Sequence, residues 1–212
     1  MSESSSNIKK KVSNKDIILE TAYALFLKKG FKSVSIKDIM EDSGISKGGV
    51  YHHFESKEAI LFAVLDQYFF KALSIDPSAF EGLTFKERIH KVYHLGTGLF
   101  AMVETMGKKG IAYPIQRLFQ FQLECENFPE MRRQFGETSS AYKSFVKNIV
   151  EEGIRNQEVK KELDADTLSY QIIGMIEGIA VHHSTVKKDV GALLIEKYNK
   201  VFESYFKFIC TE

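Results

Sequence analysis

The stretch Ser35–Phe54, with the sequence SIKDIMEDSGISKGGVYHHF, constrains the fold of this chain more than any other segment. The apolar residues of its first half recur at the spacing of one helical face: Ile36, Ile39 and Met40. Ser35 can cap this helix, and Gly44 follows where a left-handed residue commonly ends one, because glycine takes a positive φ at little cost. Ser46 then caps a second short helix. The segment therefore predicts two helices joined by a tight turn, the helix-turn-helix pattern.

A supporting helix is predicted before this motif, over residues 14–29, and Gly30 ends it. Its apolar stripe consists of Ile18, Ala22, Leu25 and Phe26. Val50 and Phe54 supply an inner face for the helix after the turn, so three short helices can enclose one small core. We expect this domain to span residues 14–60, with its motif at 35–54. The outer side of the third helix carries groups that can approach or bond phosphates and base edges: Lys47, Gly48, Gly49, Tyr51, His52 and His53. The alternative for the two histidines is that they are solvated surface residues.

Composition and charge agree with a DNA-binding end on a larger globular body. Hydrophobic residues make up 44% of the 212 residues and charged residues 27%, which is enough for a buried core. Residues 1–57 carry ten Lys and Arg against seven Asp and Glu, whereas the rest carries nineteen against twenty-one. Residues 1–13 are predicted to form a disordered basic arm, which either touches DNA or only aids solubility.

The cysteine content and the absence of long apolar runs predict a cytoplasmic protein. Its two cysteines, Cys125 and Cys210, lie far apart and outside any CxxC spacing, which favours a reducing compartment. No apolar run approaches the ~18 residues that a membrane span requires. The Ser- and Lys-rich start lacks the apolar core of a signal peptide.

Taken together, these residues resemble the DNA-binding domain of the TetR family of bacterial transcriptional regulators. The matching positions are Ile18-Leu19, Ala22, Phe26, Gly30-Phe31, Ser35-Ile36, Asp38-Ile39, Gly44 to Gly48, Tyr51, His53-Phe54 and Ser56-Lys57-Glu58. The resemblance implies that one set of residues touches the DNA backbone: Ser35, Ser46, Tyr51, His53 and Lys57. It implies that a second set faces the major groove: Lys47, Gly48, Gly49 and His52. Val34 and Met40 depart from the Thr and Ala that are frequent in the family, without weakening the resemblance.

The rest of the chain, residues 61–212, is predicted to be helical throughout, which gives an all-α protein of about nine helices. A helix over about 59–74 joins the two parts, and Pro77 breaks the chain after it. Further helices are expected at about 84–107, 112–125, 127–156, 164–186 and 190–209. No segment alternates with the period of a strand for long enough to predict a sheet.

Aromatic and sulfur-containing residues crowd the first two of these body helices and the start of the third. The first of them also contains Gly96-Thr97-Gly98, a costly sequence inside a helix unless a bend or cavity is needed. Core packing would explain each aromatic residue separately. Together with the family resemblance, which implies a small-molecule effector pocket, they predict a ligand site lined by Tyr93, His94, Thr97, Phe100, Gln116 and Phe119. His90 and His94 stand four residues apart, but no third metal ligand is evident nearby, so we predict neither a metal nor a cofactor.

The last two helices carry more apolar surface than one packing face requires, which predicts contact with a second copy of the chain. The residues assigned to this interface are Ile172, Met175, Ile179, Tyr198, Phe202 and Tyr205. The resemblance likewise implies a dimer formed by a four-helix bundle. Two recognition helices about one helical turn apart would then read a palindromic operator.

The leading interpretation is a dimeric repressor that a small-molecule effector releases from palindromic double-stranded DNA. A ligand-independent or activating regulator is the first alternative. A helical enzyme or ligand carrier is a remote one, because no GxSxG motif, P-loop or nucleophile–base pairing occurs in the sequence.

Overall fold

A computed structural model describes residues 13–107 and 110–211 of the chain. Over these residues the protein consists of nine α-helices, one π-helical segment and one short 3-10 helix. The described residues contain no strand, and extended chain pairs only at an isolated bridge between Val159 and Cys210. The predicted all-α class is therefore confirmed. The predicted arm lies outside the described residues, apart from Ser13.

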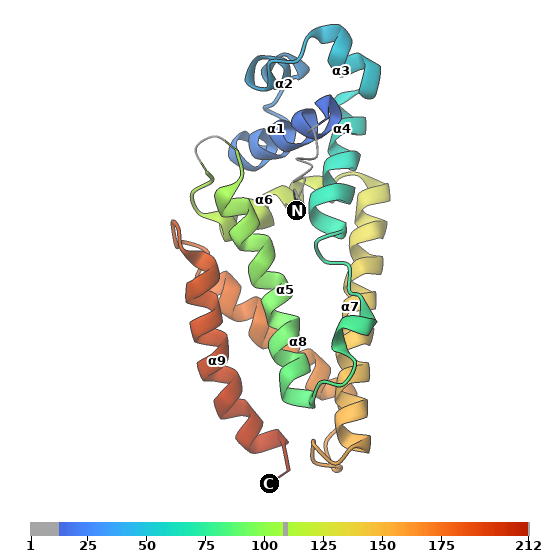
Figure 1. Ribbon diagram of the computed structural model, residues 1–212, viewed down its shortest axis with the longest axis vertical. Helices are drawn as coiled ribbons and strands as arrows, with labels where there is room; N and C mark the ends of the chain where they lie inside the picture. Colours follow the sequence, from blue (N-terminus) through green and yellow to red (C-terminus); the bar gives the residue numbers. More distant parts are fainter. Residues whose placement is uncertain (1–12, 108–109, 212) are drawn as a thin grey trace, which may run out of the picture.

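The N-terminal helices, α1 (Asn14–Lys29), α2 (Ile36–Ser43) and α3 (Lys47–His53), together with α4 (Lys57–Val64), form a small head at one end of the molecule (Figure 1). Serine side chains fix where these helices begin. Ser13 and Ser35 each cap a helix in a capping box, and Ser46 and Ser56 cap the next two. Gly44 ends α2 with a φ of 73°, as the sequence predicts.

The core of the head is made by the apolar stripes that the sequence shows. Its fully buried side chains include Ile18, Ala22, Ile39, Val50 and Ile60. Because Val50 points inward on α3, the opposite side of that helix faces away from the head. This is the arrangement that a helix needs to enter a DNA groove.

The connection between the head and the rest of the chain differs from the continuous α-helix predicted over about 59–74. α4 ends at Val64 and passes into a π-helical turn, Leu65–Phe70. A 3-10 helix, Pro77–Phe80, follows, and the Asp76 side chain caps it. Single π-helical turns inside α-helices occur often at functional sites. Here the turn brings Phe69 into the body.

The body contains α5 (Phe85–Thr105), α6 (Pro114–Cys125), α7 (Pro129–Arg155), α8 (Ala165–His182) and α9 (Val190–Ile209). α5 packs along α9 and α7 along α8, while α6 lies next to the head and contacts α1 (Figure 1). Thr84 and Glu87 form a capping box at the start of α5, and Asp164 caps α8. None of the described helices is long and apolar enough to cross a membrane.

Candidate DNA-binding surface and ligand cavity

α3 presents most of the predicted DNA-contacting residues on one exposed surface. Lys47, Gly48, His52 and His53 are exposed, and Tyr51 keeps 46% of its surface accessible. The Ser46 hydroxyl accepts a hydrogen bond from the Gly49 amide at 3.2 Å, which fixes the start of the helix. A row of hydrogen-bonding and cationic groups therefore stands clear of the head core.

The two adjacent glycines of α3 have different surroundings. A Cβ on Gly49 would lie 2.8 Å from the Ile45 side chain, so the turn before α3 requires glycine there. A Cβ on Gly48 would meet nothing within 4 Å. Gly49 is thus explained by packing inside the head, whereas Gly48 leaves open space at the surface where DNA is expected.

Ser35 has a structural task in addition to its predicted contact with the DNA backbone. Its hydroxyl accepts a hydrogen bond from the Asp38 amide at 3.2 Å and donates to Asp38 Oδ2 at 2.5 Å. Hydrogen bonds from Ser35, and then from Lys29, lower the pKa of the Asp38 carboxyl to about 2. The carboxylate stays ionised and holds the first turn of α2. The phosphate contact of Ser35 stays a prediction.

Lys57 braces the turn between α1 and α2. Its ammonium group donates to the carbonyl oxygens of Phe31, at 3.0 Å, and Val34, at 2.8 Å. The same group lies 4.2 Å from the centroid of the Phe31 ring. These three contacts make Lys57 a positioning residue of the head, and the contact with the DNA backbone that the family resemblance implies stays a prediction.

α6 of the body contacts the same turn from the other side. The Glu124 carboxylate accepts a hydrogen bond from the Phe31 amide at 2.7 Å. The Phe31 ring packs edge-to-face on Phe26 of α1 and on Phe128, which precedes α7. Phe31 therefore joins the head to the body, and movement of α6 would be felt at the head.

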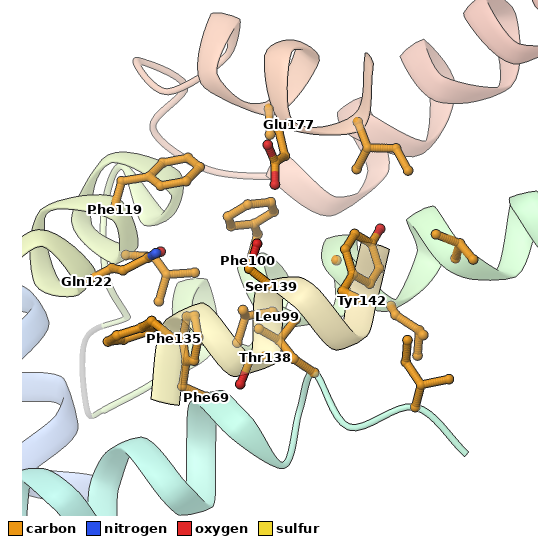
Figure 2. A pocket seen from close by; sticks show the side chains of 18 of the residues that line it. Phe69, Leu99, Phe100, Phe119, Gln122, Phe135, Thr138, Ser139, Tyr142 and Glu177 are labelled. Atoms are coloured by element: carbon orange, nitrogen blue, oxygen red, sulfur yellow. The ribbon is translucent and has the colours of Figure 1, made fainter. Parts of the chain in front are cut away.

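A cavity of about 210 Å³ opens between the π-helical turn and α5, α6, α7 and α8. Six aromatic residues line it: Phe69, Phe100, Phe119, Phe135 and Tyr142, which Figure 2 labels, and Tyr198 of α9. Gln122, Thr138, Ser139 and Glu177 add polar groups. Gly96 also lines it, so the glycine-containing part of α5 serves the cavity without interrupting the helix. An apolar hollow with a few polar groups is the usual form of a small-molecule site.

Residues 18–64 match the family model of bacterial regulatory proteins of the tetR family. The protein belongs to the TetR family. The HTH-type transcriptional regulator YfiR of Bacillus subtilis is 26% identical over 180 residues, which is 83% of this chain and 84% of the relative. The HTH-type transcriptional repressor KstR2 of Mycolicibacterium smegmatis is 26% identical over 161 residues, 76% of this chain and 74% of the relative. The fold is also that of a transcriptional regulator from Saccharomonospora viridis solved with choline, with a TM-score of 0.70, 20% identity, and coverage of 93% of this chain and 98% of that one.

As a member of the TetR family the protein is a DNA-binding transcriptional regulator, and its exposed α3 is the predicted recognition helix. Of the predicted ligand residues of this TetR regulator, Phe100 and Phe119 line the cavity. The Tyr93 hydroxyl instead donates to Asn199 Oδ1 at 2.5 Å on α9, and the Thr97 hydroxyl to the His94 carbonyl at 2.9 Å. His94 and Gln116 are exposed and do not line the cavity.

The cavity residues of the π-helical turn, α7 and α8 were not predicted from the sequence: Phe69, Phe135, Tyr142 and Glu177. The helical stripes of the sequence show which residues are apolar, but not which buried face has incomplete packing. His90 belongs to neither site, because its ring stacks on Phe206 of α9. No group of three possible metal ligands occurs among the described residues of the TetR regulator.

The six residues predicted to form the dimer interface on α8 and α9 divide into three that are buried and three that are half-buried. Ile172, Tyr198 and Phe202 are buried within the subunit and belong to its core, which corrects their assignment to a surface. Met175, Ile179 and Tyr205 are half-buried. The exposed apolar residues of the two helices are Tyr170, Val181, Val201 and Phe208. The apolar stripe predicted on α9 is the face that packs on α5, whereas α8 packs on α7 and α9.

Two substitutions on α3 separate sequence readout from backbone contact in this TetR regulator. His52→Ala should change the preferred operator, because a lost base contact is worth about 1–3 kcal/mol at one position. Tyr51→Phe removes only a hydroxyl and should weaken binding to all operators by a similar factor. Competition binding to a randomised half-site library measures both. Equal losses on every sequence for His52→Ala would contradict its groove assignment.

Proposed function

We propose that the protein is a homodimeric repressor that binds a palindromic operator and leaves it when a small molecule enters the cavity. It acts in the bacterial cytoplasm, where its DNA target lies. The observation that carries the proposal is the position of the cavity, whose walls include both connections to the head. Phe69 lies in the turn that continues α4, and Phe119 and Gln122 lie on α6. A ligand there can favour one head position only by binding that conformation better.

The path through α6 that connects the cavity to the head is short. Gln122 lines the cavity, and Glu124, two residues further along the same helix, accepts the hydrogen bond from Phe31. A shift of α6 on ligand binding would pull on the turn between α1 and α2. The path through the π-helical turn is direct as well, because Leu65–Phe70 follows α4 without a break. Both routes would change the separation of the two recognition helices.

The exposed apolar face of α8 and α9 supports the dimer. Val201 and Phe208 lie on the same side of α9, and Val181 is exposed on α8. Gly174 and Gly178 are one turn apart on α8 and have nothing within 4 Å of a Cβ, which permits close approach by another helix. Two α8–α9 pairs can therefore form a four-helix bundle, which would place two copies of α3 on one DNA duplex.

Two similar proteins support the remaining parts of the proposal, which are repression and the binding of a small molecule. KstR2 of M. smegmatis is a repressor, and the S. viridis regulator was solved with choline. A ligand-independent or activating regulator would need no hollow body, so the aromatic cavity favours the ligand-responsive form.

DNase footprinting of the region upstream of the protein's own gene tests this function. The expected footprint contains two symmetric half-sites about one helical turn apart, and it is protected in the absence of ligand. A reporter fused to the same region should become active when the gene is deleted. Failure to protect any sequence there would contradict the operator. A reporter that loses activity on deletion would show an activator.

A further inference from the structure

The charge of the cavity restricts its ligand further than its apolar walls do. Among the described residues that line it, Glu177 is the only one with a side chain that is charged at neutral pH. No Lys, Arg or His of the described chain lines the cavity. Glu177 sits at the rim on α8 and points its carboxylate towards Phe100 (Figure 2). The cavity therefore has a negative group at one end and no positive group to balance it.

Glu177 has no partner of its own in the described part of the chain. No described residue donates a hydrogen bond to its carboxylate or forms an ion pair with it. Glu177 is an exposed residue, but its position at the rim partly removes the carboxyl from water, which disfavours the charged form and raises its pKa. A bound cation would supply the missing counter-charge, whereas a bound anion would add a like charge beside it.

The aromatic walls favour the same sign of charge. Phe69, Phe100, Phe119 and Phe135 surround the cavity together with Tyr142. The face of an aromatic ring carries negative electrostatic potential, so several rings around one space attract a cation that has little hydration to lose. An alkylated ammonium group meets this requirement, since it carries charge on an apolar surface.

We propose that the effector is a compact lipophilic organic cation whose ammonium group lies between Glu177 and the aromatic rings. This inference rests on the proposed function, because it assigns a chemical class to the same site. The volume of about 210 Å³ equals that of about seven water molecules in the liquid, which fits a compact ligand. Gln122, Thr138 and Ser139 offer neutral hydrogen-bonding groups for a polar substituent.

Three probes of similar size but different charge test the inference on the full-length dimer. They are benzyltrimethylammonium, its uncharged carbon isostere neopentylbenzene, and phenylacetate. The chain contains no tryptophan, so isothermal titration calorimetry and thermal shift are suitable readouts. We expect the cation to bind at least about tenfold more tightly than the isostere, and the anion to bind most weakly.

Glu177→Gln keeps the size of the side chain and removes its charge. It should weaken binding of the cation about tenfold and leave the isostere within about twofold. Glu162→Gln is the matched control, because it makes the same charge change at another exposed position, between α7 and α8, that does not line the cavity. It should leave all three affinities unchanged.

The outcomes separate this inference from the proposed function. The assignment of the effector as an organic cation would be overturned if the isostere or phenylacetate bound as tightly as the cation. It would also be overturned if Glu177→Gln left the affinity for the cation unchanged. If one of those probes also released the operator, the cavity would still be the effector site. Failure of all three to bind would overturn the inference as well. The footprint without ligand tests operator binding independently of every probe.

Discussion

Phe202→Ala is expected to lower the free energy of unfolding by about 3–5 kcal/mol, the largest effect of any substitution considered for this protein. The ring is fully buried on α9. It stacks on Tyr93 of α5 with 5.3 Å between ring centroids and packs against Phe206 at 5.8 Å. Removing it leaves a cavity at the α5–α9 contact. Domains of this size have only about 5–15 kcal/mol of stability, so the variant should unfold at a much lower urea concentration.

Phe208→Ser provides the control on the same helix. The ring is 72% exposed and faces away from the core, so the change should cost a single subunit less than about 0.5 kcal/mol. If the proposed dimer uses this face, Phe208→Ser should weaken dimerisation, and a higher protein concentration should restore stability. A higher concentration should not rescue Phe202→Ala. If the Phe202→Ala variant instead kept the wild-type midpoint of urea unfolding and only its dimer dissociated, Phe202 would be an interface residue.

The contrast between these two phenylalanines shows what helical periodicity could predict. The spacing of apolar residues in α9 located the helix and its main buried stripe. Periodicity does not say whether a stripe packs on its own subunit or on a partner, so Tyr198 and Phe202 were assigned to the wrong contact. Only the position of α5 beside α9 decides that Phe202 is core.

The head was predictable because its signals are local. Ser35, Gly44 and Ser46 each act within a few residues of their own position, and their roles in the structure follow from capping and from positive φ. The cavity was predicted in part. Phe100 was found from its own helix, whereas Phe135 and Glu177 arrive from α7 and α8, far along the chain. Residues brought together by tertiary packing leave no spacing that a single sequence can show.

Lys57 illustrates a second limit, because a residue type that suits phosphate binding can serve the protein itself. Lys57→Met keeps the apolar stem next to Phe31 but removes the donor to the Phe31 and Val34 carbonyls. A hydrogen bond to a charged group contributes about 1.5–3 kcal/mol, so we expect the head to lose about 3 kcal/mol of stability. Operator affinity should fall for every sequence, because the turn that sets the positions of α1 and α2 loosens. Thermal unfolding and operator titration over a range of salt concentrations measure the two effects.

Lys37→Met removes the same charge from the head without removing a brace. Lys37 is an exposed residue of α2, and its ion pair with Glu41 is a surface pair of the kind worth at most about 0.5 kcal/mol. It should therefore leave the melting temperature unchanged. If Lys57→Met also melted like the wild type, and reduced the salt dependence of operator binding by about one charge, Lys57 would be a phosphate ligand and no brace. A lower melting temperature for Lys57→Met alone, with an unchanged salt dependence of operator binding, would support the action of this ammonium group on DNA through the turn it holds.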